Sequence, residues 1–301
     1  MSPMSWMELA AETSSANTPP AEAEATTPTP AHVGILRDEI LVLRWVFGYC
    51  DVTAVSGPAI SGLSAGKLRK SQIRDVRFIA VDIDALQENN GVIQQFHIGI
   101  SALDTRTLRR LATIWPDATS TTDAIESHHL VIGNAKFSRS KSNKFLFGQF
   151  ETLSMPDFRA KLETLTIHRN VVLVVHGGRR ELDIFQRLEL DLDQIYFMDT
   201  VKAAQSPLRL SYRYSLERLL EELGIPFANL HCAGNDAHFV LRALLMIAVV
   251  DVEQQVGTAF LPEWSFAAKQ IAQAPRPFTK AEIEQQSTHA GSVAPKGPRV
   301  I

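Results

Sequence analysis

The chain has 301 residues, of which 45% are apolar and 21% charged, an ordinary globular composition that allows one large domain with appendages or two small domains. Its formal net charge of −3 gives no global attraction to nucleic acid or anionic membrane, so a polyanion must bind at a local basic patch or through bound cations. The two cysteines, Cys50 and Cys232, lie far apart, which argues against a disulfide framework or a structural zinc site and predicts two buried thiols.

Residues 1–31 are rich in Ala, Thr, Pro and Glu and contain no Lys or Arg, so we expect a disordered tail. They lack the arginines of a mitochondrial presequence and the charged start and apolar block of a secretory signal. The most apolar windows elsewhere are too short and too interrupted by charge to span a bilayer. We therefore expect a cytoplasmic or nuclear protein with no signal peptide, transit peptide, transmembrane segment or membrane partner.

The next segments predict an extension before the main domain. Residues 33–50 carry apolar side chains on a helical period, and the Gly- and Ser-containing stretch 55–67 reads as a connector. We expect a helix outside the main fold and a linker over 32–72. The main domain is predicted at 73–252, followed by a C-terminal extension at 253–301 that is largely disordered after residue 274.

The main domain alternates between strand and helix patterns. Strands are predicted at 77–83, 91–101, 128–133, 170–176 and 194–199, and helices at 155–168, 180–190, 214–223 and 234–250. Three successive strands followed by alternating helices and strands predict an α/β fold. Its mixed five-stranded sheet begins antiparallel, continues in parallel βαβ units and has helices on both faces.

The first predicted strand ends on two aspartates, Asp82 and Asp84. Side chains at i and i+2 of a strand point to the same face, so the two carboxylates should stand side by side. Like charges this close favour either a cation between them or a solvated strand end. Taken alone, the solvated strand end is the simpler interpretation, because carboxylates often close strands.

Three further segments bring acids or histidines to strand ends and helix starts. They are "VVLVVHGGRRELDIF" (171–185), "YFMDTVKAA" (196–204) and "NLHCAGNDAHF" (229–239). Each has a structural alternative, because acids in a first helical turn complement the macrodipole and Asp199 would make an ordinary N-cap. We expect His176 and its two glycines to shape a turn, and we expect the histidines without spaced carboxylate partners to be structural: His97, His128, His129, His168 and His238.

The joint order of these groups resembles the DEDDh branch of the ribonuclease H-like exonucleases. In that family an Asp-x-Glu motif ends the first strand, and a His followed by four residues and an Asp comes last, as in His231 and Asp236. "FLFGQFETLS", "YFMDTVKAAQ" and "YSLERLLEELGIPFANLHCAGNDA" look like the fungal group named for "great for full DEAD-box protein". The resemblance covers residues 74–250 and implies a ribonuclease H-like three-layer fold.

The resemblance implies a metal site of four carboxylates, with two departures from the family pattern. Asp82 matches the first family Asp, and Asp84 stands where the family has Glu. In the second motif Glu181 stands at the Asp position, with Asp183 as the fallback, and Asp236 matches the last Asp. One acid is shorter and another longer than in the family, so the number of carboxylates is kept while their reach is changed.

The implied activity is metal-dependent 3′–5′ exonucleolytic cleavage of RNA or single-stranded DNA. Two Mg²⁺ or Mn²⁺ ions about 4 Å apart would be held by hard oxygen ligands and stabilise an in-line displacement. By resemblance, His231 would deprotonate the attacking water, because a histidine pKa lies near neutrality. The catalytic set implied is therefore Asp82, Asp84, Glu181, His231 and Asp236.

Basic residues supply a candidate nucleic-acid surface. The segment 136–144 has almost no opposing charge, and two arginines flank the turn before Glu181. The basic side chains concerned are Lys136, Arg139, Lys141, Lys144, Arg179 and Arg180. They are expected either to follow a phosphate backbone or to form a solvated surface loop.

Two other functions compete with the nuclease. The acid exchanges at Asp84 and Glu181 favour a catalytically weak or inactive adaptor on a nuclease fold, which binds nucleic acid and an RNA-processing protein in RNA processing or mRNA export. A nucleotide-binding protein that uses "HGGRR" as its phosphate loop is disfavoured, because a Gly-Gly pair is no phosphate-loop fingerprint.

Overall fold

The computed structural model describes residues 34–49, 73–114, 123–133 and 142–291. Its centre is a six-stranded sheet with the order β4-β3-β2-β1-β5-β6. The strands are β1 (Arg77–Asn89), β2 (Val92–Asp104), β3 (Ile125–Ile132), β4 (Phe150–Leu153), β5 (Val171–Val175) and β6 (Gln194–Asp199). Strands β1, β2 and β3 are antiparallel, and β5 and β6 continue the sheet parallel to β1, which confirms the mixed sheet predicted from the sequence.

The predicted strand number was wrong, because β4 adds a sixth strand at the edge. This strand has only four residues, "FETL", none of them fully buried, and it pairs in parallel with β3. A short, half-exposed edge strand has neither an apolar run nor a clear alternation. Its pairing with β3 is a tertiary contact, which the local pattern does not encode.

Strands β1 and β2 form a hairpin of two 13-residue strands, longer than predicted. Asn90 and Gly91 make the turn with positive φ angles of 51° and 77°, the backbone that a two-residue hairpin loop requires. The register shifts between Asp84 and Gln87, where Ala85 has a φ of 51°. Asp82 and Asp84 of β1 therefore lie just before an irregularity that changes the direction of the strand.

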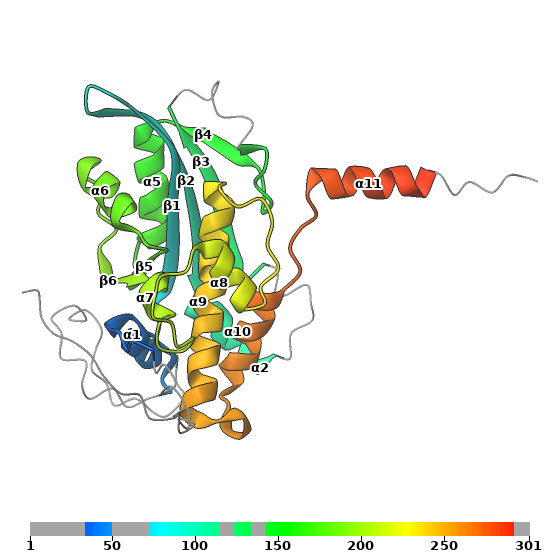
Figure 1. Ribbon diagram of the computed structural model, residues 1–301. Helices are drawn as coiled ribbons and strands as arrows, with labels where there is room; N and C mark the ends of the chain where they lie inside the picture. The colour runs from blue at the N-terminus through cyan, green and yellow to red at the C-terminus, as the bar shows by residue number, and fades with distance from the viewer. Residues whose placement is uncertain (1–33, 50–72, 115–122, 134–141, 292–301) are drawn as a thin grey trace, which may run out of the picture. The chain divides into compact units, whose positions relative to one another are not determined.

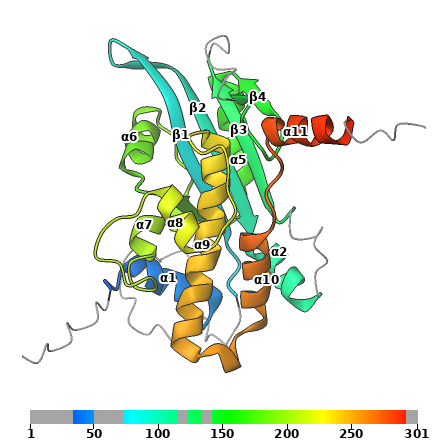
Figure 2. The same ribbon diagram turned by 45° about the vertical axis from the view of Figure 1, so that its right-hand side comes forward.

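Helices cover both faces of the sheet, as expected for the three-layer fold (Figures 1 and 2). On one face lie α5 (Met155–Thr166) and α6 (Arg179–Arg187), whose apolar side chains share a core with Ile79, Val81 and Ile83 of β1. The other helices are α1 (Asp38–Phe47), α2 (Thr105–Thr113), α7 (Thr200–Ala203), α8 (Leu216–Glu222), α9 (Ala233–Val256), the 3₁₀ helix η3 (Thr258–Phe260), α10 (Glu263–Gln273) and α11 (Lys280–Gly291). Phe78 and Ala80 of β1 belong to the core that α9 shares, so even-numbered residues of β1 face α9.

Helix α1 belongs to the packed core, which corrects the prediction of a helix outside the main fold. Phe47 stacks on Trp264 of α10 with ring centroids 4.4 Å apart. Arg44 donates to the Asp251 carboxylate of α9 at 2.8 and 2.9 Å. The helical period predicted a buried face correctly, but only the tertiary structure shows that α9 and α10 cover it.

Helix α11 lies in the stretch for which the sequence predicts disorder. It begins with a capping box, in which the Thr279 hydroxyl accepts from the Glu282 N–H and the Glu282 carboxylate accepts from the Thr279 N–H at 2.7 Å. Arg276 adds an ion pair to Glu282 at 2.6 Å. The polar, Pro-containing composition of this stretch led to the prediction of disorder, although the capping box is a local signal for the start of a helix.

Helix α9 is 24 residues long and is buried over most of its length. It runs along the sheet in both ribbon views, and its first turn carries Asp236 (Figures 1 and 2). Among the helices in the described part of the chain, none combines the length and the apolarity needed to cross a membrane.

Candidate active site

Strand β1 presents Asp82 and Asp84 on the face that packs against α9, the same face as Phe78 and Ala80. In the register of the hairpin, Asp82 lies opposite Gly99 of β2. A Cβ atom at Gly99 would stand 1.8 Å from the Ala233 carbonyl oxygen, so the start of α9 touches the backbone of β2 here. Because Gly99 has no side chain, the first turn of α9 can approach the acids of β1.

Three of the predicted acids lie within electrostatic reach of the fourth, Asp82. The pKa of Asp82 is raised well above its usual value, first by burial and then by the carboxylates of Asp236, Glu181 and Asp84. The Arg180 guanidinium opposes this rise in pKa. Three elements that are distant in sequence, β1, α6 and α9, thus bring their acids to one place.

Glu181, and not Asp183, points from α6 toward this cluster. The Glu181 carboxylate lies near the backbone of Ile83, which stands between the two aspartates of β1, and burial raises the pKa of Glu181. The Asp183 side chain is 63% exposed and pairs with Arg187 at 3.6 Å. Burial of Ile184 and Phe185 against the sheet sets this orientation of the helix.

The start of α9 joins His231 to Asp236. The backbone N–H of His231 donates to Asp236 Oδ2 at 3.0 Å, and His231 has a φ of 62° with an exposed side chain. Asn235 fixes the same turn, because its side chain accepts from the Leu146 N–H and donates to the carbonyls of Lys144 and Asn229. The backbone of His231 is thus bonded to one of the acids, and its imidazole is exposed at the surface.

Buried His129 bonds to the start of α9, which is a structural role, as the sequence analysis expected. His129 Nδ1 accepts from the Gly234 N–H at 3.1 Å, so the proton of the neutral ring is on Nε2, facing His97 Nδ1 at 3.2 Å. Burial, with a smaller effect of neighbouring His97, lowers the pKa of His129 to about 4. His129 therefore satisfies one of the free N–H groups of the helix end.

His129 is the last of four consecutive polar residues in β3, "IESHHLVI", so the local pattern does not single it out. Cys232 lies beside it with Sγ 3.6 Å from His129 Nδ1 and is buried, as predicted. Cys50 lies outside the described residues.

Asp199 and His176 have the structural roles expected of them. Asp199 Oδ1 accepts from the Val201 N–H at 3.0 Å as the N-cap of α7, and from the Gly177 N–H at 2.9 Å. His176 Nε2 donates to the Tyr214 carbonyl at 3.1 Å, and its Nδ1 lies 2.9 Å from Thr200 Oγ1. These bonds fix the turn between β5 and α6 from which Glu181 extends.

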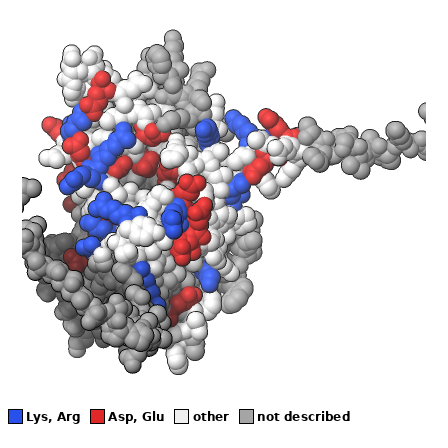
Figure 3. All heavy atoms as spheres, viewed as in Figure 1, with Lys and Arg blue, Asp and Glu red and all other residues white. Residues whose placement is uncertain are grey.

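The predicted basic residues fall into two groups. Lys136, Arg139 and Lys141 lie outside the described residues, whereas Lys144 is exposed and its carbonyl is tied to Asn229 and Asn235. Arg179 and Arg180 are exposed at the start of α6. Figure 3 shows acidic side chains between α6 and the start of α9, with basic side chains beside them.

The donor set agrees in kind with Mg²⁺ or Mn²⁺, because four carboxylates with one nearby arginine leave an excess of negative charge and hard oxygen atoms. Within the ranges that the structure describes, however, no three His, Cys, Asp or Glu side chains are placed so that they could hold one ion. The chemistry of the site fits the metal, and the coordination geometry stays a prediction.

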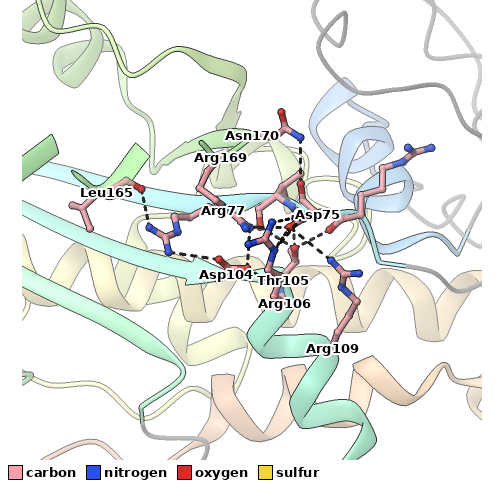
Figure 4. A network of polar contacts seen from close by, with 11 residues as sticks. Asp75, Arg77, Asp104, Thr105, Arg106, Arg109, Leu165, Arg169 and Asn170 are labelled. Atoms are coloured by element: carbon pink, nitrogen blue, oxygen red, sulfur yellow. Dashed lines mark hydrogen bonds and ion pairs between the residues drawn. The ribbon is translucent and has the colours of Figure 1, made fainter. Parts of the chain in front are cut away.

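A second charged cluster occupies the other end of β1 (Figure 4). Arg169 donates to Asp75 and to Asp104, each at 2.9 Å, and Arg106 donates to Asp75 with its Nη2 at 2.7 Å. This network ties the chain before β5 to the start of β1 and the end of β2. It contains paired charges of both signs, and we assign it to the fold.

Comparison with known proteins supports the family resemblance and the fold. The family model described as the DNA polymerase III subunit epsilon-like, C-terminal domain (DEDDh_C) matches residues 77–247, more than half of the chain. A search of curated proteins returned no match. The family match confirms the DEDDh resemblance seen in the sequence, whereas the likeness to the fungal group stays a prediction.

Proposed function

The chain belongs to the family of DNA polymerase III subunit epsilon-like C-terminal domains, a DEDDh exonuclease-type fold, and we propose that it is a metal-dependent 3′–5′ exonuclease for RNA or single-stranded DNA. The observation that supports this proposal most strongly is the electrostatic influence of three acids, one each from β1, α6 and α9, on Asp82. A fold needs no such concentration of like charge, which is costly unless a cation neutralises it.

We propose Asp82, Asp84, Glu181 and Asp236 as the ligands of Mg²⁺ or Mn²⁺. When bound, the metal supplies positive charge that polarises the phosphate and stabilises the oxygens of the displacement. Glu181 lies near the backbone of Ile83, and Asp236 is held for this role by the N–H of His231.

In the proposed reaction, a water oxygen forms a bond to the terminal phosphorus and the bond to the 3′ oxygen of the preceding nucleotide breaks. His231 takes the proton of the attacking water on its exposed imidazole. The 3′ oxygen of the preceding nucleotide takes up a proton from solvent water and becomes a free 3′ hydroxyl, and the terminal nucleotide leaves as a 5′ monophosphate. Arg180, beside Asp82 and Glu181, is placed to contact the phosphate.

We propose that the substrate strand follows the basic residues Lys136, Arg139, Lys141, Lys144, Arg179 and Arg180. The Lys144 backbone supports this path, because its carbonyl is bonded to both asparagines of the His231 turn. RNA and DNA differ at the 2′ hydroxyl, so parallel assays on both will identify the substrate.

The test is cleavage of 5′-labelled and 3′-labelled single strands of RNA and of DNA with Mg²⁺ or Mn²⁺. We expect a ladder of shortened products from the 5′ label and immediate release of mononucleotide from the 3′ label. Asp82→Asn and Asp236→Asn should abolish both, and Asp183→Asn, at the exposed acid of α6, should leave them unchanged. Products cut internally, or cleavage that survives both substitutions in the cluster, would contradict the proposal.

One observation supports a second candidate, an adaptor that binds nucleic acid and an RNA-processing partner without cutting. Asp84 is one methylene shorter, and Glu181 one longer, than the family motifs at these positions. If the wild type binds strands and leaves them whole, while Asp84→Glu combined with Glu181→Asp cuts them, the natural protein is the adaptor. Each single exchange serves as the control, because only the pair restores the family pattern.

A further inference from the structure

The segment between α7 and α8 exposes an ordered aromatic group. Tyr212 is 53% exposed, and its ring centroid lies 5.2 Å from that of Tyr214 at an angle of 54°. The Arg218 guanidinium lies over the Tyr214 ring at 4.8 Å and 6.0 Å from the Tyr212 ring. These contacts hold the rings in place at the surface.

Packing of α8 does not require this arrangement. The helix buries Leu219 and Leu220 and begins at Ser215, whose hydroxyl accepts from the Arg218 N–H. Tyr212 precedes the cap and leaves more than half of its surface in solvent. An exposed ring that is nevertheless fixed by its neighbours is suited to stacking against a flat ligand, because little conformational freedom is lost on binding.

The aromatic group is connected to the candidate active site through one turn. The Tyr214 carbonyl accepts from His176 Nε2 at 3.1 Å. His176 begins the turn that leads to Glu181 at the start of α6, and Asp199 holds Gly177 in that turn. The segment that carries the rings is therefore bonded to the turn from which Glu181 extends.

The charge around the rings favours a polyanion with flat groups. Arg213, between the two tyrosines, and Arg218 are exposed, and the exposed Arg179 and Arg180 follow His176 in the adjoining turn. Glu222 partly offsets this charge next to Arg218. Rings interleaved with arginines match a single strand, whose bases are free to stack and whose phosphates pair with cations. A duplex offers no free base face for Tyr212.

We propose that Tyr212, supported by Tyr214 and Arg218, is a stacking platform for a base of the single strand that enters the active site. The inference rests on the proposed function for its ligand and adds the place where a base is bound. Because every base has an aromatic face, the platform binds without sequence preference.

The test is binding of fluorescent twelve-residue oligouridine and oligothymidine in chelator, where no strand is cut. Tyr212→Ala should weaken binding roughly 5- to 100-fold, the usual effect of removing a ring that stacks on a base, and Tyr212→Phe should bind like the wild type. Phe266→Ala on α10 is the matched control, since Phe266 is also 53% exposed. Arg213→Ala should flatten the salt dependence of binding, whereas Tyr212→Ala should leave its slope unchanged.

An oligonucleotide with abasic sites separates stacking from charge. The wild type and Tyr212→Ala should bind this strand equally, because it has no base for the ring to contact. An equal loss on abasic and normal strands, or no loss on either, would overturn the platform while leaving the proposed nuclease intact. Ring-dependent binding without cleavage would instead contradict the nuclease and support the platform, and a wild type that binds no strand would overturn both.

Discussion

The backbone N–H of His231 donates to Asp236 Oδ2 at 3.0 Å, across the first turn of α9. The residue proposed as the base and a residue proposed as a metal ligand are therefore joined by one hydrogen bond. This bond requires the left-handed backbone of His231, whose φ is 62°. A variant that removes the imidazole must keep this backbone if chemistry is to be separated from geometry.

His231→Asn meets that condition, because Asn tolerates positive φ better than most residues. We expect it to slow cleavage about 10²- to 10⁴-fold, the usual loss on removing a general base, with metal binding nearly intact. Single-turnover cleavage and the metal-induced shift in Tm measure the two effects. His168→Asn is the control, because His168 is also exposed and has a φ of 56°. A full loss of metal binding in His231→Asn would contradict the role of base.

Asp82→Asn should raise the stability of the metal-free protein. Burial and three neighbouring carboxylates raise the pKa of Asp82, so its ionised form opposes folding at neutral pH. We expect a higher Tm in chelator, by about 2–4 °C for each kcal/mol gained, and a smaller increase than the wild type when Mg²⁺ is added. Asp183→Asn should alter neither value. A Tm lowered in chelator would indicate that the acid is structurally required.

Acid should weaken the fold through His129. Its pKa is about 4 in the folded protein and 6.5 for an unperturbed histidine, so below pH 6.5 the unfolded chain binds a proton that the folded chain does not. The stability present above pH 6.5 should fall as the pH drops toward 4, by on the order of 3 kcal/mol. His129→Asn should show a shallower fall in urea titrations at several pH values. Buried His238, whose pKa is also lowered, contributes its own loss of stability at acid pH in both proteins.

Gly99→Ala should displace the start of α9. The added Cβ would overlap the Ala233 carbonyl, which is backbone and has no rotamer to change. We expect a loss of roughly 1–3 kcal/mol, or more, together with a loss of the metal-induced Tm shift because Asp236 moves. Gly91→Ala in the hairpin turn is the control, since its Cβ meets nothing within 4 Å and only its φ of 77° is strained. A normal metal response in folded Gly99→Ala would refute this coupling.

Reversing charge in the basic segment should weaken binding to single strands. Lys141→Glu with Lys144→Glu removes two cations, so the slope of log K against log salt should fall by about 0.7 for each phosphate that is no longer neutralised. Arg110→Glu on α2, an exposed arginine, should leave the slope unchanged. Binding with an unaltered salt slope in the double variant would assign the segment to solvent.

Local periodicity was sufficient to predict much of this protein. The period of two along β1 places Asp82 and Asp84 on one face, and the caps and apolar stripes predicted the main helices and five of the six strands. The order of the motifs also predicted the family that the match over residues 77–247 supports. These features depend on residues that are close in sequence, or on their order along it.

The tertiary structure decided how distant segments meet. Glu181 and Asp183 both lie near the start of one helix, and the burial of Ile184 and Phe185 against the sheet determines which of them faces β1. The absence of a side chain at Gly99 and the bond from Gly234 to His129 bring Asp236 to the same place. The rotation of a helix and the close approach of two backbones are set by packing between elements, which no local pattern encodes. The sequence therefore identified the candidate acids, and the tertiary structure determined which of them lie together.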